Sequence, residues 1–113
     1  MVAGTAFAGW ASVGHAITFD CVRGSAKVGD VGRVCALFEQ RLSAAFPGRV
    51  VHRSDDADVV LVVEMSGEQS FVARVDWRGR ARGDALGVAV KGAALGEEKK
   101  AELIDSLLRT MPQ

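Results

Sequence analysis

Cys21 and Cys35 are the residues of this sequence whose chemistry is easiest to define, because they are its only cysteines. Their spacing is not that of a C-x-x-C redox pair or a zinc knuckle. Both occupy inward positions of consecutive predicted elements that should pack together. If the protein is exported, we therefore expect a disulfide, and closing a loop of about 15 residues would stabilise the fold by about 3 kcal/mol. Two buried thiols in a cytosolic core are the alternative.

His52 lies close in sequence to three aspartates, Asp55, Asp56 and Asp58. A histidine beside carboxylates can bind a metal or act as a general base. Aspartates also build the turns between strands, and a single histidine in a strand is usually a surface residue. We therefore predict no metal or cofactor here. A small enzyme whose site around His52 forms at an oligomer interface remains an alternative.

Sequence motifs for catalysis are missing. No stretch matches the glycine patterns that bind dinucleotides or phosphates, and no serine lies in G-x-S-x-G. Because both cysteines are predicted to point inward, there is also no exposed nucleophile beside a histidine. Enzymatic activity is therefore disfavoured.

Arginines are concentrated in and after the segment 70–78. They are Arg74, Arg78, Arg80 and Arg82. Guanidinium groups on one hairpin could bind phosphate, acidic polysaccharide or an acidic protein face, or they could simply form a solvated edge that discourages aggregation. The whole chain has 14 basic and 14 acidic residues, and the one aromatic residue among these arginines, Trp77, is predicted to point inward. Nucleic acid is therefore not a predicted partner.

The segment 57–65 contains an unbroken apolar run, residues 59–63, which is typical of a central strand. This strand should therefore position the candidate residues named above. Strands are also predicted over 17–22, 49–53 and 70–78, with a last one carrying Leu86, Val88 and Val90. Apolar stripes with helical spacing predict helices from a cap at Asp30 to Phe46, and over residues 95–111. In the segment 70–78, the outward positions from Arg74 onward are Arg74, Asp76 and Arg78, and all three are charged. One face of the sheet should therefore be in contact with water.

The order of these elements is strand, helix, four strands, helix, which predicts an α+β fold. We expect a two-layer sandwich: a mainly antiparallel sheet of four or five strands with both helices on one face. Residues 17–113 should form a single domain, since 113 residues suit one domain and the loops are too short to be linkers.

Residues 1–16 differ from the rest of the chain, because they contain no charged side chain apart from His15 and are rich in small apolar residues. They resemble the apolar core of a secretory signal peptide, with a cleavage site at 14–16, although the positive region is missing. The alternative is an apolar N-terminal segment that is retained. With a signal peptide the protein would be periplasmic or secreted; without one it would be cytoplasmic. A transmembrane helix is not predicted, because the segment is short and contains several Gly and Ser residues.

The layout resembles small periplasmic α/β modules, such as the N-terminal domain of the Tol-Pal propeller protein and the curli secretion lipoprotein. The similarity lies in a strand and helix followed by a meander that opens with Ala57-Asp58-Val59-Val60-Leu61. It concerns the fold alone, and no residue role follows from it.

These observations predict a non-catalytic binding or assembly module of the bacterial cell envelope, with a protein partner or self-association. A cytoplasmic accessory subunit is a further alternative. With both helices on one side, one set of side chains of the central strand lacks a cover. We expect either Val60 and Val62, or the alternate set (Val59, Leu61 and Val63), to be covered by the N-terminal apolar segment if it is retained, or by a partner or a second copy if it is cleaved. An exposed apolar patch of this kind usually marks an interaction surface.

Overall fold

The computed structural model describes residues 16–78 and 82–110. Its elements are β1 (Ile17–Arg23), α2 (Gly32–Ala45), β2 (Val51–Arg53), β3 (Val59–Ser66), β4 (Ser70–Trp77), β5 (Leu86–Ala89) and α3 (Glu97–Arg109). This is the predicted order and the predicted α+β class. The signal-like segment up to residue 15, Arg80 and the last predicted residue of the second helix, Met111, lie outside the described residues.

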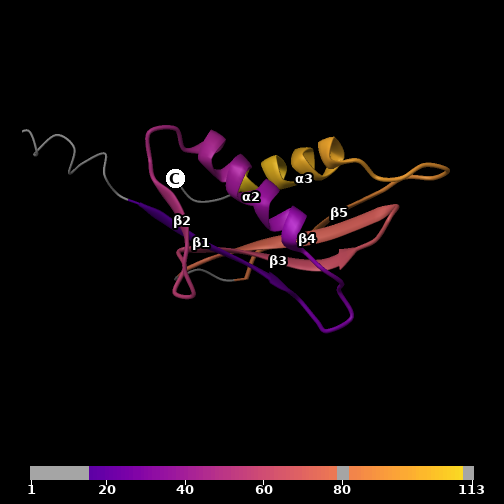
Figure 1. The fold of residues 1–113 in the computed structure, drawn as a ribbon, viewed down its shortest axis with the longest axis horizontal. Helices are drawn as coiled ribbons and strands as arrows, with labels where there is room; N and C mark the ends of the chain where they lie inside the picture. Colours follow the sequence, from indigo (N-terminus) through magenta and orange to yellow (C-terminus); the bar gives the residue numbers. More distant parts are fainter. Residues whose placement is uncertain (1–15, 79–81, 111–113) are drawn as a thin grey trace, which may run out of the picture.

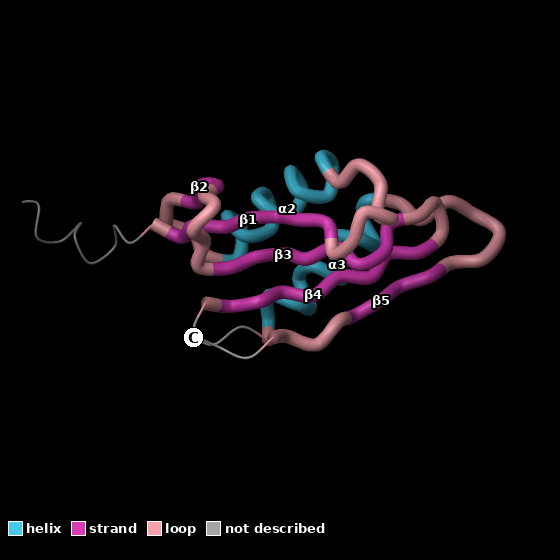
Figure 2. The backbone as a smooth tube through the Cα atoms, turned by 90° about the horizontal axis from the view of Figure 1, so that it is seen from below, coloured by secondary structure: helices cyan, strands magenta, loops and turns pink. Residues whose placement is uncertain are grey.

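The five strands form one sheet in the order β2-β1-β3-β4-β5, which places β3 in the middle as predicted (Figure 2). The prediction of a mainly antiparallel sheet is wrong in detail, because the sheet is mixed. β1 pairs parallel with both β2 and β3, whereas β3, β4 and β5 pair antiparallel as two hairpins. The first half of the sheet is therefore parallel and the second half antiparallel.

In the parallel half of the sheet, β1 has a different neighbour along each of its two edges. β2 lies beside Ile17–Phe19, and β3 lies beside Phe19–Arg23. The chain from β2 to β3 passes from one edge of β1 to the other, and Asp58 fixes this crossing. Its backbone N–H donates to the Thr18 hydroxyl oxygen at 2.9 Å, and the Thr18 hydroxyl donates to the Asp58 carboxylate at 3.1 Å. With these two hydrogen bonds, a short polar loop is sufficient to carry the chain from β2 to β3, and the two strands do not form an antiparallel hairpin.

Both helices lie on the same side of the sheet, as predicted (Figure 1). The core between the two layers is built from alternate residues of the strands and one stripe of each helix. The strand residues are Ile17, Phe19, Cys21, Val59, Leu61, Val63, Phe71, Ala73 and Val75, and the helix residues are Val34, Cys35, Phe38, Leu42, Leu103, Ile104, Leu107 and Leu108. Phe19 meets Phe38 edge to face at 5.8 Å between ring centroids. Burial of these side chains is the main force that holds the layers together.

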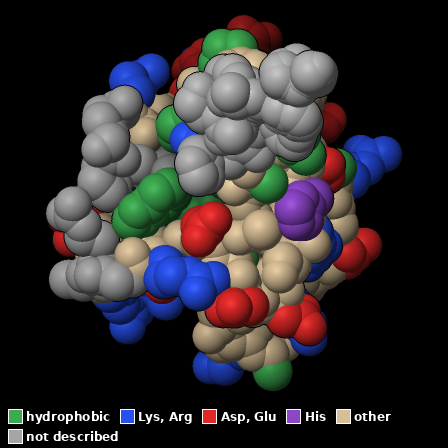
Figure 3. All heavy atoms as spheres, turned by 90° about the vertical axis from the view of Figure 1, so that its left-hand side faces the viewer, with side chains coloured by type: hydrophobic (Ala, Val, Ile, Leu, Met, Phe, Trp, Pro, Cys, Tyr) green, Lys and Arg blue, Asp and Glu red, His purple; other side chains and the backbone are tan. Residues whose placement is uncertain are grey.

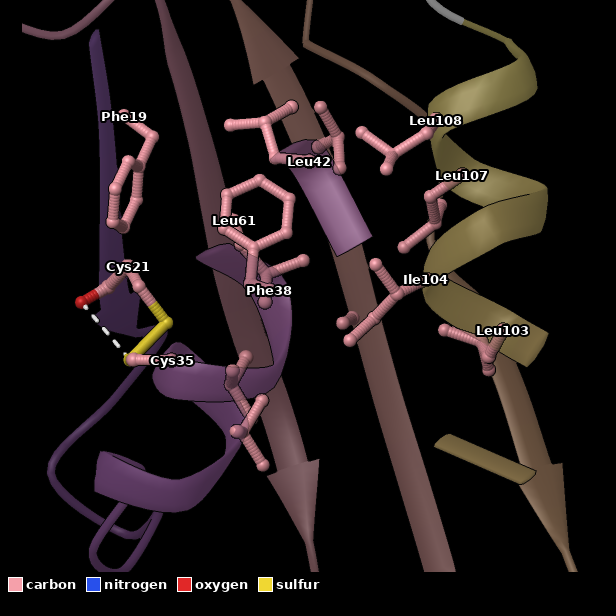
Figure 4. Packing of buried hydrophobic residues seen from close by; sticks show 14 of the residues in the cluster. Phe19, Cys21, Cys35, Phe38, Leu42, Leu61, Leu103, Ile104, Leu107 and Leu108 are labelled. Atoms are coloured by element: carbon pink, nitrogen blue, oxygen red, sulfur yellow. Dashed lines mark hydrogen bonds between the residues drawn. A yellow bond between two sulfur atoms is a disulfide. The ribbon is translucent and has the colours of Figure 1, made fainter. Parts of the chain in front are cut away.

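The disulfide between Cys21 and Cys35 is formed, as predicted, and it links β1 to α2 (Figure 4). The two Cα atoms lie 5.6 Å apart, inside the usual range for a bridge. The Cys35 sulfur also lies 3.7 Å from the Cys21 carbonyl oxygen. This is a contact rather than a hydrogen bond, because a bridged sulfur has no hydrogen to donate.

Both helices are slightly shorter than predicted. α2 begins at Gly32 after Val31, so Asp30 is not its cap residue, although the Asp30 carboxylate accepts the Gly32 N–H at 2.9 Å. In α3 the first turn carries Glu97 and Glu98 and the last turn carries Arg109, which complements the helix dipole as predicted. None of the helices in the described part of the chain has the length and apolar character needed to cross a membrane.

Arg41 of α2 and Asp105 of α3 connect the two helices on their outer side. The guanidinium donates from Nε and Nη2 to the two carboxylate oxygens, both at 2.8 Å. The hydrogen bond and charge of Asp105 raise the pKa of Arg41, so this bidentate pair is charged at neutral pH.

Candidate functional site

The candidate site is the face of the sheet that the helices leave open, which is turned toward the viewer in Figure 2. Residues of β3 alternate between the two faces, and Val59, Leu61 and Val63 belong to the core under the helices. Val60 and Val62 therefore point to the open face, and this decides between the two sets considered from the sequence. Val62 pairs directly with Arg74 of β4. The structure thus brings the predicted apolar surface and one of the predicted arginines together.

The apolar part of this face is a narrow valine strip rather than a broad patch. Its members are Val22, Val60, Val62 and Val72. Val62 is only 6% exposed although no helix of the described part of the chain covers this face. Val22 and Arg74 flank Val62 on the neighbouring strands. The backbone of Gly24 also lies close to it, because a Cβ added to Gly24 would be 3.4 Å from the Val62 side chain. Val22, by contrast, is 36% exposed, and Met65, which pairs with Val72, is 49% exposed, so the apolar part of this face is open to contact at Val22 of β1 and at Met65 of β3.

An ionic network lies beside the valine strip, centred on Arg74. The Arg74 guanidinium binds the Glu64 carboxylate and donates from Nε to Asp76 at 3.1 Å. Arg82 reaches the same Glu64 carboxylate at 3.4 Å, and Asp76 also accepts the Gly83 N–H at 3.1 Å. The Arg74 side chain is 14% exposed, much less than the 69% of Arg82. Arg74 is therefore held in place, whereas Arg82 extends into solvent.

Two opposing effects act on the pKa of Arg74. Burial alone lowers it, because a charged group loses hydration. Hydrogen bonds and charges from Asp76 and Glu64 outweigh that effect, and the pKa is raised. The guanidinium is therefore a fixed positive charge between two carboxylates, which suits recognition of a polar partner and not proton transfer.

Arg78 lies at the end of β4, away from the network, and is also paired. It contacts Asp56 at 2.9 Å and Asp58 at 3.5 Å. The three described arginines of the predicted cationic hairpin, Arg74, Arg78 and Arg82, thus each face at least one carboxylate. Since acidic partners accompany every one of them, the local charge favours a surface of mixed sign over a phosphate-binding patch.

His52 is exposed on the short edge strand β2. Nearby Asp58 is bound to Thr18 and Arg78, and Asp56 is paired with Arg78, so these carboxylates have structural tasks. The end of the molecule seen in Figure 3 shows a histidine among exposed side chains of both charges. Across residues 16–78 and 82–110, no group of three or more His, Cys, Asp or Glu residues could hold a metal ion. Among the described residues, Asp56 and Asp58 are thus paired with Arg78 and Thr18, and no hydrogen bond or ion pair joins either of them to His52.

Two of the hollows on the described part of the chain lie next to α3, away from the open face. One, of about 360 Å³, lies between the C-terminal ends of α2 and α3 and is lined by Arg41, Phe46 and Asp105 among others. The other, of about 430 Å³, runs between β5 and α3. No buried side-chain nitrogen or oxygen in the described part of the chain lacks a hydrogen-bond partner. Neither hollow therefore contains a buried polar side-chain atom without a hydrogen-bond partner that a ligand could bind.

Sequence reasoning missed the partners of Arg74. Asp76 could have been found, because it alternates with Arg74 on the outward side of the predicted strand. Glu64 could not, because the register between β3 and β4 shifts between Val63 and Met65. A residue at such a bulge does not follow strand alternation, so its direction is not readable from the sequence.

Comparison with known proteins adds little to this picture. No protein-family model matches the chain, and no curated protein matches it. Among solved structures, a PelC dodecamer from Paraburkholderia phytofirmans is similar over 84% of this chain and 88% of that chain, with 13% identity and a TM-score of 0.48. Likeness at this level supports no statement about function, which must come from the molecule itself.

Proposed function

We propose that this protein is a non-catalytic binding or assembly module of the bacterial cell envelope, and that a protein partner contacts the open face of its sheet. The observation that carries the proposal is that face itself: the helices cover the sheet on one side only. The opposite side joins an apolar strip to a fixed ionic network. Such a mixture of apolar contact and oriented charge is typical of protein interfaces.

The disulfide supports an envelope location. Bridges between buried cysteines form and persist in oxidising compartments and are rare in the cytosol of most organisms. Cys21 and Cys35 are bridged here. N-terminal sequencing of protein from a fractionated native host tests the location: the proposal expects it in the periplasmic fraction without residues 1–16. Recovery from the cytosol with those residues attached would contradict it.

Val22 is the position at which to test the open face. It is on the valine strip and is exposed enough that a charged side chain can reach water without disturbing the core. We expect Val22→Arg to fold with an unchanged melting temperature and to lose binding. The protein is isolated from its native host without reductant. Binding is then measured by light scattering, as the presence of a complex of defined stoichiometry.

Val50→Arg is the matched control. Val50 is 62% exposed and lies outside the strands, so the same charge is added away from the open face. If the proposal is correct, the wild-type protein and the Val50→Arg variant each form the complex, and the Val22→Arg variant does not. Equal binding by both variants would show that the open face is not the contact surface.

A further inference from the structure

The outer edge of β5 is a free strand edge. β5 is last in the sheet order, and among the described residues no strand pairs with its outer side. Its four residues, Leu86–Ala89, include no proline and no charged side chain. Natural proteins usually protect a free edge with such residues, because exposed backbone groups can pair with another strand. β5 is therefore available for pairing.

The register with β4 shows which backbone groups are free. Val90 donates its N–H to the Gln69 carbonyl at 2.9 Å, so these two opposed residues form a hydrogen-bonded pair. In an antiparallel ladder such pairs alternate, so Leu86 and Val88 also direct their N–H and C=O groups toward β4. Gly87 and Ala89 must direct theirs toward the free edge.

A groove runs along the same edge. It lies between β5 and α3 and is lined by residues 86–90 and, from α3, by Lys99 and Glu102 among others. Leu86 faces the helix side, as predicted from the sequence, but it is 37% exposed because no further strand covers it. On the α3 side the rim carries one charge of each sign, with Lys99 and Glu102 3.8 Å apart. The edge thus combines unpaired backbone, apolar side chains and a rim without net charge.

The opposite edge of the sheet does not share these properties. β2 has only three residues, Val51–Arg53, and its last two are the exposed His52 and the charged Arg53. Arg53 is also bound to Asp20 at 3.1 Å. A short strand with charged and polar side chains is a typical protected edge. Only β5 is suited to accept another strand.

We propose that β5 pairs with β5 of a second copy of this chain, antiparallel and about a two-fold axis at Val88. This register follows from the free groups. It places Gly87 of one copy opposite Ala89 of the other, so that each pair exchanges both hydrogen bonds on either side of the axis. Leu86 then meets Val90 of the second copy on the helix side, which covers its exposed surface. The neutral rim lets two identical copies approach without repulsion.

Cysteine cross-linking tests this register directly. Val88 would face Val88 of the second copy as a non-hydrogen-bonded pair, with about 4.5 Å between Cα atoms, which a disulfide can span. Val88→Cys is therefore expected to give a covalent dimer under mild oxidation, read by mass in the absence of reductant. Val90→Cys is the matched control, because its partner would be Leu86 and not itself. Equal dimer yields from both variants, or none from Val88→Cys, would overturn the proposal.

A proline variant tests the hydrogen bonds without a new covalent bond. Ala89→Pro removes an N–H that β4 does not use, so the isolated fold should keep its melting temperature while half of the intermolecular hydrogen bonds are lost. Ala89→Val keeps the N–H. With so short a strand the dimer should be weak, so sedimentation is measured over a wide concentration range. We expect concentration-dependent dimers for wild type and Ala89→Val and at least tenfold weaker association for Ala89→Pro.

Two results of the sedimentation experiment would refute the dimer: a monomer at every concentration, or association that Ala89→Pro leaves unchanged. Contact through the open face is distinguishable, because Val22→Arg would abolish that association and leave pairing at β5 intact.

Discussion

The two faces of the sheet are built by different means. On the helix-covered face, strand positions are apolar and almost all fully buried, and a disulfide joins the layers. On the open face, valines alternate with Arg74, Glu64 and Asp76, which satisfy one another. The covered face supplies stability through burial, whereas the open face retains water contact and oriented charge. One side of the sheet therefore holds the fold together, and the other side keeps charged side chains in contact with water.

The largest expected effect concerns the covered face. Phe38 is completely buried and packs against Phe19. Phe38→Ala should lower the free energy of unfolding by about 3–5 kcal/mol, because it removes buried apolar surface and leaves a cavity. Urea denaturation measures this loss. Gln40→Ala, at an exposed position of the same helix, is the control and should change stability little. Similar losses in both variants would contradict the described packing.

A smaller loss should follow from removal of the disulfide. Replacement of both Cys21 and Cys35 by alanine should cost about 3 kcal/mol, since the unfolded chain regains the freedom that the bridge removes. Reductant should destabilise the wild-type protein by a similar amount. The double variant should not respond to reductant at all. Any response would mean that reductant acts on something other than this bridge.

The smallest expected effect lies on the open face. Arg74→Met should lower the free energy of unfolding by about 1–3 kcal/mol, because Glu64 and Asp76 lose the charge that compensates them. Arg82→Met is the control: its side chain contacts the same Glu64 but is mostly exposed, so its loss should be about 0–1 kcal/mol. Equal losses would show that the network is not centred on Arg74. Denaturation of both variants in parallel decides this.

The pH dependence of the Arg74 contribution has a definite sign. A raised pKa means that the stabilising charge is present below the unfolded-state pKa and is lost as pH rises through the folded-state pKa. The pKa of the guanidinium is strongly alkaline in both the folded and the unfolded state. The part of the stability difference between wild type and Arg74→Met that comes from this charge should therefore stay constant near neutral pH. A change in that difference between pH 6 and 9 would have to come from another group.

Much of the fold was predictable because it depends on local patterns. Alternation in 70–78 placed Phe71 and Ala73 inward and Arg74 outward, and helical spacing identified both buried stripes. The inward positions of Cys21 and Cys35 predicted the disulfide. Strand order was less accessible. Which neighbours β1 takes depends on the loop that Asp58 fixes against Thr18, and a contact across forty residues leaves no local pattern.

The candidate site was predictable in its parts but not as a site. Val60, Val62 and Arg74 were each singled out, yet nothing local showed that Val62 and Arg74 are direct neighbours. Asp76 lies in the same strand as Arg74, but the other carboxylates that neutralise the predicted cationic hairpin come from the loop before β3 or from the bulge in β3. Their effect on the local charge could be judged only from the assembled sheet.

Local patterns in the sequence indicated which residues form helices and strands, which helix faces are buried, and that the two cysteines meet, because periodicity acts over short distances. The mixed pairing of the sheet, the direction of Val60 and Val62 away from the helices, and the unprotected edge at β5 are evident only in the folded chain. The physical reason is that strand pairing is a contact between distant segments, and each such contact depends on loops, bulges and neighbours that no single segment encodes.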